Sequence, residues 1–80
     1  MTQSEIEAFI IAQWTARIAE KGEDTSAIGP ATALLQSAGA DSLDLAVLVS
    51  ALEAYTGHDP FAAAVPEFRT IRDLARLYAG

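Results

Sequence analysis

Residues 41–55, DSLDLAVLVSALEAY, carry the strongest helical signal in the sequence. Asp41 is placed to accept a free backbone N–H as the N-cap residue, and Asp44 lies in the first turn, where the helix dipole favours a carboxylate. Gly57 follows the apolar pattern and is a typical residue at the end of a helix. The segment therefore predicts a helix that begins at Ser42.

Another helix is predicted before it, from Ser4 to Glu20. Ser4 is followed three residues later by Glu7, which is the spacing of a capping box. The apolar residues of this segment recur at helical intervals, so they share one face. They are Ile6, Ile10, Trp14 and Ile18, flanked by Phe9 and Ile11. We expect this face, with Trp14, to lie in the core.

Residues 21–40 between these helices are rich in Gly, Ser, Thr and Ala, and Gly29-Pro30 interrupts any helix there. A loop of this length is uncommon without a function, so we expect apolar side chains to pin it to the core. The candidates are Ile28, Leu34 and Leu35. The segment has room for one short turn of helix.

Residues 59–65 predict a short helix, because Asp59-Pro60 has the pattern of an N-cap followed by the first helical residue. Pro66 would stop this helix. Its burial would rest on Phe61 and Val65.

A last helix is predicted from Thr70, with Asp73 as the acid of its cap. Its apolar residues at helical spacing are Leu74, Leu77 and Tyr78. No strand pattern or internal repeat is present in the sequence. We therefore predict an all-α fold, a small four-helix bundle of three main helices plus one short helix, with a long loop between the first and second helices. Residues 1–80 would form a single domain.

Composition and charge exclude several classes of function. The net charge of −6 disfavours nucleic acid and anionic membranes, because both attract clustered Lys and Arg. The chain has no cysteine and one histidine, which excludes disulfides and the usual structural zinc sites, so we expect no metal. No apolar run is long enough to span a bilayer, and no signal peptide is recognisable. We expect a cytoplasmic protein that is a monomer.

The helix that begins at Ser42 has two apolar faces, which cannot share one core. The larger side chains lie on one face: Leu45, Leu48, Val49, Leu52 and Thr56. The opposite face holds Leu43, Val47, Ser50 and Ala54, bordered by Asp44 and Glu53. The pattern indicates a protein-docking surface. The alternative is that the bundle buries both faces, or leaves scattered apolar residues in solvent.

Ser42 lies where the loop meets this helix, so its hydroxyl should be accessible and the helix dipole would favour a phosphate ester there. The alternative is that Asp41-Ser42 is an ordinary helix start without modification. A nucleophilic serine would need a base, and His58, the only histidine, would lie beyond the far end of a helix roughly 20 Å long. We therefore expect no catalytic residues, and His58 is interpreted as a polar turn residue.

The segment from Leu34 to Gly57 resembles the acyl and peptidyl carrier protein family, centred on Gly39-x-Asp41-Ser42-Leu43. The later Thr70-Ile71-x-Asp73-Leu74 is similar to the last-helix signature of that family. The resemblance covers essentially the whole chain. It implies that Ser42 receives 4′-phosphopantetheine from coenzyme A, with Asp41 and Leu43 as the flanking motif. The arm would carry an acyl or aminoacyl group as a thioester.

The resemblance also implies the partners: a phosphopantetheinyl transferase, a loading ligase or acyltransferase, and downstream synthase, transferase or tailoring enzymes. The residues expected to dock them are Leu43, Asp44, Ala46, Val47, Ser50, Glu53 and Ala54. The chain would then be a carrier without catalytic activity. The alternative is a helical interaction module that uses the same face but carries no arm.

The sequence departs from the family pattern at positions where many members carry acids, which here hold Gln36, Ser37 and Val47. Docking should therefore depend more on apolar contact than on ion pairs. The weak acidity of this face favours a polyketide, nonribosomal peptide or related specialised pathway over general fatty-acid biosynthesis. Because the sequence ends at Gly80 with no second module, we expect a discrete carrier. Tyr55 stands one position earlier than the aromatic residue of the family, and Asp59-Pro60 replaces its usual Ile-Pro.

Overall fold

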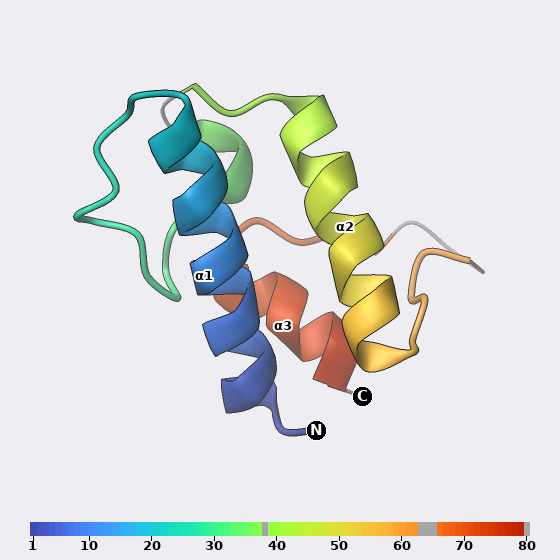
Figure 1. Ribbon diagram of the computed structural model, residues 1–80. Helices are drawn as coiled ribbons and strands as arrows, with labels where there is room; N and C mark the ends of the chain where they lie inside the picture. The colour runs from blue at the N-terminus through green and yellow to red at the C-terminus, as the bar shows by residue number, and fades with distance from the viewer. Residues whose placement is uncertain (38, 63–65, 80) are drawn as a thin grey trace.

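A computed structural model of the chain describes residues 1–37, 39–62 and 66–79. It contains three α-helices and one short 3₁₀ turn in the order α1 (Gln3–Glu20), η1 (Leu34–Gln36), α2 (Ser42–Thr56) and α3 (Ile71–Ala79) (Figure 1). The described residues form no strand, only an isolated antiparallel bridge between Ala33 and Thr70. The all-α prediction and its three main helices are confirmed.

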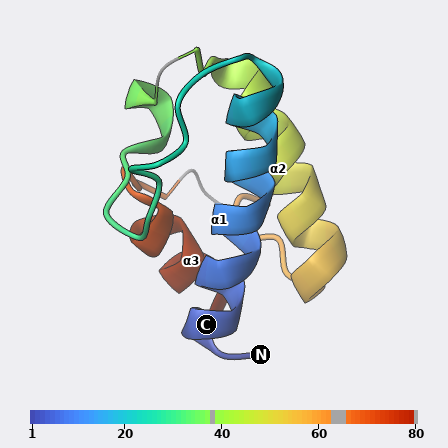
Figure 2. The same ribbon diagram turned by 60° about the vertical axis from the view of Figure 1, so that its left-hand side comes forward.

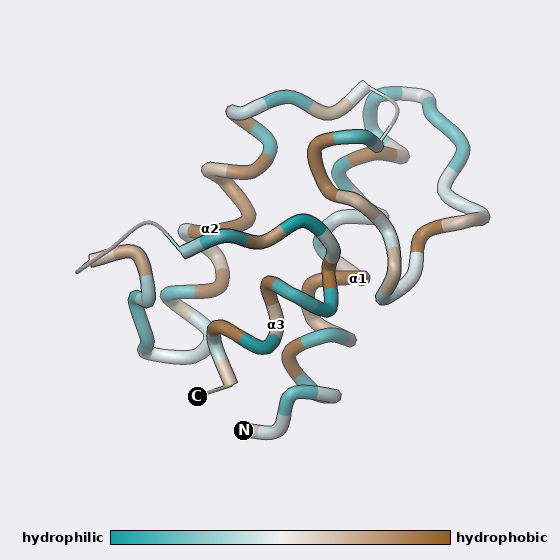
Figure 3. Tube along the Cα trace, turned by 180° about the vertical axis from the view of Figure 1, so that it is seen from behind, coloured by the Kyte–Doolittle hydropathy of each residue, from teal (hydrophilic) through white to brown (hydrophobic). Residues whose placement is uncertain are grey.

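Helices α1 and α2 run antiparallel, and α3 packs across the lower half of α1 (Figures 1 and 2). Hydrophobic and hydrophilic segments alternate along α1 and α3, as expected for helices with one buried face (Figure 3). The core takes buried side chains from all three helices and from η1: Ile6, Ile10, Trp14, Ile18, Leu34, Leu48, Leu52, Ile71, Leu74, Ala75 and Tyr78. The predicted core face of α1 is confirmed.

The start of α1 differs from the prediction. Thr2, not Ser4, is the N-cap: the Glu5 N–H donates to Thr2 Oγ1 at 3.2 Å, and the Thr2 N–H donates to Glu5 Oε1 at 2.9 Å. The sequence contains two overlapping capping boxes, and the earlier one lengthens the helix and so adds backbone hydrogen bonds. The box predicted at Ser4 and Glu7 is therefore wrong.

The long loop is pinned to the core through η1, where Leu34 is fully buried and Ile28 is partly buried. Leu35, however, is 57% exposed, so its predicted burial is wrong. Successive side chains in a 3₁₀ turn point about 120° apart, so Leu34 and Leu35 cannot both face the core.

The loop also holds the start of α3 through backbone hydrogen bonds that the sequence did not predict. The Leu34 N–H donates to the Arg69 carbonyl at 3.0 Å, and the Ile71 N–H donates to the Thr32 carbonyl at 3.0 Å. The Arg72 N–H donates to the Pro30 carbonyl at 2.9 Å. Because orphan N–H groups at a helix start need acceptors, the loop stabilises α3 as well as covering the core.

The short helix predicted over residues 59–65 is not confirmed. The described part, residues 59–62, forms turns, in which the Phe61 N–H donates to Asp59 Oδ1 at 3.2 Å and the Ala62 N–H donates to the Asp59 carbonyl at 3.2 Å. Side-chain capping of this kind competes with regular helix. Phe61 is partly buried, packed edge-to-face on Phe68, whereas Val65 lies outside the described residues.

The predicted cap of the last helix is confirmed. The Asp73 N–H donates to Thr70 Oγ1 at 3.1 Å, and Asp73 Oδ2 accepts the Thr70 N–H at 3.1 Å. Leu74 and Tyr78 are buried, and Leu77 is partly buried. Among the described residues, no helix is both long and apolar enough to cross a bilayer.

Candidate functional site

Ser42 is the first residue of α2 and is exposed, as are its neighbours Asp41 and Leu43. Leu43 exposes 65% of its surface. Gly39 lies three residues before Ser42 with φ +76°, a left-handed conformation that favours glycine. The structure thus presents the motif that the sequence singled out at the junction between the long loop and α2.

A capping box fixes the first turn of α2 around Ser42. The Asp44 N–H donates to Asp41 Oδ1 at 3.1 Å, and the Asp41 N–H donates to Asp44 Oδ2 at 2.9 Å. Each aspartate therefore satisfies a backbone donor of the other, which holds the chain on both sides of Ser42. The predicted N-cap role of Asp41 is confirmed.

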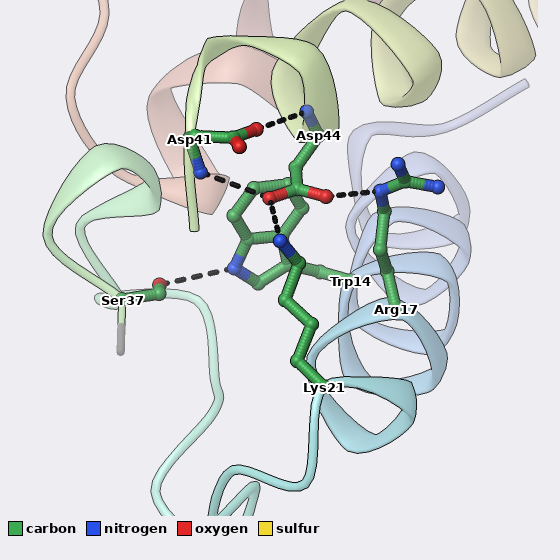
Figure 4. Close-up of polar contacts among 6 residues, drawn as sticks. All are labelled: Trp14, Arg17, Lys21, Ser37, Asp41 and Asp44. Carbon is green, nitrogen blue, oxygen red and sulfur yellow. Dashed lines mark hydrogen bonds and ion pairs between the residues drawn. The ribbon is translucent and has the colours of Figure 1, made fainter. Parts of the chain in front are cut away.

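Asp44 is buried, with only 1% of its surface exposed. Its carboxylate pairs with the Arg17 guanidinium and with Lys21 Nζ, the latter at 2.8 Å from Oδ2 (Figure 4). The Lys21 ammonium, the Asp41 N–H and Arg17 together hold the pKa of Asp44 well below its usual range. A carboxylate this low in pKa is ionised throughout the physiological range.

The predicted place of Asp44 on the border of an exposed docking face is therefore wrong. Asp44, Leu48 and Leu52 are spaced four residues apart, so they share one face of α2, and all three are buried. The spacing was the signal that could have placed Asp44 inside. Its partners are Arg17, in the last turn of α1, and Lys21, the C-cap of that helix four residues later. The sequence pattern did not predict these two partners.

The other residues expected on the docking face lie where the helical wheel placed them. Val47 is 43% exposed, and Glu53 is partly exposed. The remaining exposed members are Leu43, Ala46, Ser50 and Ala54. The opposite face is buried at Leu48 and Leu52 and partly buried at Leu45, Val49 and Thr56. The second helix therefore does not bury both faces.

Beside Val47, a small groove separates α2 from α1, with a volume of about 140 Å³. It is lined by Gln13, Trp14, Ala16, Arg17, Glu20, Val47 and Leu48. Side chains of α1 therefore border the exposed face of α2, which the helical wheel of a single helix could not show.

The burial of Glu53 and the nearby Asp59 raise the pKa of the Glu53 carboxyl above its ordinary value. His58, the only histidine, is exposed beyond the C-cap Gly57, and its backbone N–H donates to Thr56 Oγ1 at 3.1 Å. It lies at the other end of α2 from Ser42, as predicted. Over residues 1–37, 39–62 and 66–79, no group of three or more His, Cys, Asp or Glu could hold a metal ion.

A protein-family model described as phosphopantetheine attachment site matches residues 11–78 of the chain. The chain belongs to this phosphopantetheine attachment family. The match spans α1 from its second half, the long loop, α2 and nearly all of α3. Searches of curated proteins and of solved structures found no match.

Membership of the phosphopantetheine attachment family makes the chain a carrier protein with a covalently attached 4′-phosphopantetheine arm. Carriers of this family are generally non-catalytic and interact with modifying and synthase enzymes. The exposed first turn of α2 and the remote position of His58 agree with such a role.

Proposed function

We propose that this carrier receives its arm on the Ser42 hydroxyl and presents acyl or aminoacyl groups to enzymes of a polyketide, nonribosomal peptide or related pathway. The observation that carries the proposal is the exposed position of Ser42 at the first residue of α2, inside the span of the family match.

The residues around Ser42 fit a phosphodiester. A helix start leaves four backbone N–H groups without helical partners, and the capping box takes those of Asp41 and Asp44. The box leaves the N–H groups of Ser42 and Leu43, which lie in the first turn, where the helix dipole also favours a phosphate. An exposed hydroxyl with exposed neighbours allows a transferase to reach the oxygen.

In the attachment step, the Ser42 oxygen forms a bond to the phosphorus that bears the pantetheine in coenzyme A. The pyrophosphate bond of coenzyme A breaks, the nucleoside bisphosphate leaves, and the Ser42 proton passes to a base on the transferase. The histidine of this chain cannot supply that base, because His58 lies past the far end of α2. Once attached, the arm supplies a thiol to which cargo is joined as a thioester.

The exposed face of α2 is the proposed docking surface for the transferase, the loading enzyme and the downstream enzymes. It combines the apolar Leu43, Ala46, Val47 and Ala54 with Ser50, and Glu53 lies at its edge. With Asp44 buried, this set is more apolar than the sequence indicated. The proposal is therefore that partners recognise the carrier mainly by shape and apolar contact.

The test is incubation with coenzyme A, magnesium and a broad-specificity phosphopantetheinyl transferase, followed by intact-protein mass spectrometry. The wild type should gain one phosphopantetheine, and Ser42→Ala should gain none. Ser4→Ala is the matched control, because Ser4 is also an exposed serine in the first turn of a helix. No adduct on the wild type, or an equal adduct on Ser42→Ala, would overturn the proposal.

The proposal also predicts that Ser42→Ala abolishes cellular function. Intact function in Ser42→Ala, together with loss of function in Val47→Glu, would indicate that the exposed face of α2 acts without an arm at Ser42. Mass spectrometry of the protein purified from its native host would also show the arm and its cargo together, which identifies the pathway class.

A further inference from the structure

The turn that contains Ser42 is fastened to α1 by one buried carboxylate. Asp44 accepts from Lys21 Nζ at 2.8 Å, from the Arg17 guanidinium and from the Asp41 N–H at 2.9 Å (Figure 4). Arg17 lies in the last turn of α1, and Lys21 is the C-cap of that helix. A single side chain thus joins the end of α1 to the start of α2.

The segment that enters α2 also rests on the end of α1. A Cβ at Gly39 would lie 3.1 Å from Glu23 Cγ and 3.5 Å from Lys21 Cδ, so the backbone approaches these side chains closely. Ser37 accepts from Trp14 Nε1 at 3.0 Å. Before Ser42, the chain is therefore held by the Trp14–Ser37 hydrogen bond and by close packing at Gly39, and after Ser42 it is held by ion pairs.

Asp44 cannot meet a partner enzyme through its carboxylate, because 99% of its surface is covered and its oxygens are occupied within the chain. Arg17 and Lys21 remain about 30% exposed, but each is directed to the same carboxylate. Removing one partner of a buried ion pair leaves an uncompensated charge. The cluster is therefore suited to fixing the turn and not to docking.

We infer that Arg17, Asp44 and Lys21 are positioning residues for arm attachment: they hold the Ser42 turn in the orientation that the transferase needs. The inference rests on the proposed function of Ser42. In this inference, Asp44 acts by fixing the Ser42 turn of its own chain and does not contact a partner enzyme directly. Misplacement of a reacting group by about 1 Å can reduce a rate by up to roughly 100-fold, which sets the scale of the effect.

The experiment measures initial rates of arm transfer from coenzyme A to the apo protein over a range of carrier concentrations. In Asp44→Asn, which keeps the shape, an amide NH₂ would face Lys21 or Arg17. We expect kcat to fall about tenfold or more with KM changed less than about twofold. Arg17→Gln should also lower kcat, whereas Arg17→Lys, which keeps the charge, should retain most of the wild-type rate.

Asp73→Asn is the matched control, because Asp73 is the equivalent acid of the α3 capping box and bonds to Arg69 and Thr70 in its own turn. It should destabilise the protein without changing kcat. All rates are taken well below each melting temperature. If Asp44→Asn does not fold, Arg17→Gln and Lys21→Gln carry the test, since both side chains are partly exposed.

A nitrogen–proton NMR spectrum distinguishes a local change in the Ser42 turn from a loss of global stability. In Asp44→Asn, the amide resonances of residues 41–45 should shift or broaden, while those of residues 71–79 keep their positions. The inference is overturned if kcat is unchanged, if KM alone rises, or if Asp73→Asn lowers kcat equally. Failure of the wild type to take any arm would instead refute the proposed function.

Discussion

At the scale of single residues, Gly39 shows how the chain is directed into α2. Its φ of +76° lies in the left-handed region, where an L residue is strained. The side chains of Glu23 and Lys21 also lie within 4 Å of the position that a Cβ would take. Gly29 differs in both respects, because its φ is not in that region and nothing lies within 4 Å of the position of its missing Cβ. Of these two positions, only Gly39 has a backbone conformation that requires glycine.

We expect Gly39→Ala to lower the free energy of unfolding by about 1–2 kcal/mol, the cost of a left-handed conformation with a side chain. Gly29→Ala should be neutral or slightly stabilising, because alanine restricts the unfolded chain. Urea denaturation followed by circular dichroism measures both. Equal losses in the two variants would contradict the argument from Gly39.

Residue roles that depend on local sequence were predictable, and those that depend on packing between helices were not. Asp41 as N-cap and Ser42 as an exposed helix start follow from a few neighbouring residues. The burial of Asp44 also required the register of α2 against α1, which brings Arg17 and Lys21 to it from more than 20 residues away. Leu34 and Leu35 are adjacent residues of the same type, so the sequence does not show which of them is buried. The 3₁₀ turn directs Leu34 into the core and leaves Leu35 exposed.

At the scale of elements, α2 has one buried face and one exposed face. Leu48 and Leu52 pack in the core, while Val47, the residue before Leu48, is 43% exposed and borders the groove toward α1. Apolar periodicity and end residues were sufficient to predict α1, α2 and α3. They did not establish a helix over residues 59–65, because the same Asp59-Pro60 pattern also starts the turns that are observed at residues 59–62.

We expect Val47→Arg to raise the KM of the transferase for the carrier at least several-fold, because a charge replaces an apolar contact on the proposed docking face. The melting temperature should change little, since substitutions at exposed positions usually alter stability by less than about 0.5 kcal/mol. Steady-state kinetics and thermal denaturation provide the two measurements.

Leu48→Arg, one position along, is the control for burial. It places a charge in the core and should unfold the domain or greatly lower its melting temperature. A similarly large loss of stability in Val47→Arg would show that Val47 belongs to the core, and the docking proposal for this face would then fail.

At the scale of the whole molecule, buried and capped groups shape the pH dependence of stability. The pKa values of Asp44 and Asp73 are lowered, that of Asp44 chiefly by Lys21 and that of Asp73 chiefly by the backbone at Thr70. Such groups stabilise the fold above their unfolded pKa, near 4, and the contribution is lost as the pH falls toward the folded value. Burial raises the pKa of Tyr78 to about 12. The effect of this group on stability therefore appears at alkaline pH, where stability is lost as the pH rises from the unfolded pKa, near 10, toward the folded value.

We expect the free energy of unfolding to fall from about pH 4 downward and again from about pH 10 upward, where the unfolded tyrosine ionises first. Asp44→Asn should be less stable than the wild type at pH 7, and the difference should narrow in acid. Tyr78→Phe should weaken the alkaline loss. Urea titrations between pH 2.5 and about 11 measure the profile.

Tyr78→Phe also tests the packing, because the buried Tyr78 hydroxyl has no hydrogen-bond partner within the described residues. Removing an unsatisfied polar group should leave stability at pH 7 unchanged or higher. A clear loss of stability in Tyr78→Phe at pH 7 would contradict this environment for Tyr78.

For Asp44, the contradicting result is a difference in the free energy of unfolding between Asp44→Asn and the wild type that does not change with pH. Such a result would rule out the role given to the Asp44 charge.

The pairing of the long loop with the start of α3 has a consequence for synthesis. The core requires Leu34 and α1 to meet residues 71–79, and the loop backbone at residues 30–34 finds its acceptors and donors at residues 69–72. On a ribosome, α1 and α2 emerge first and have little to bury against until the last of these residues leaves the exit tunnel. Ordering of the loop that leads into α2 therefore waits until α3 has been made, and the proposed attachment turn at Ser42 is fully supported only after that.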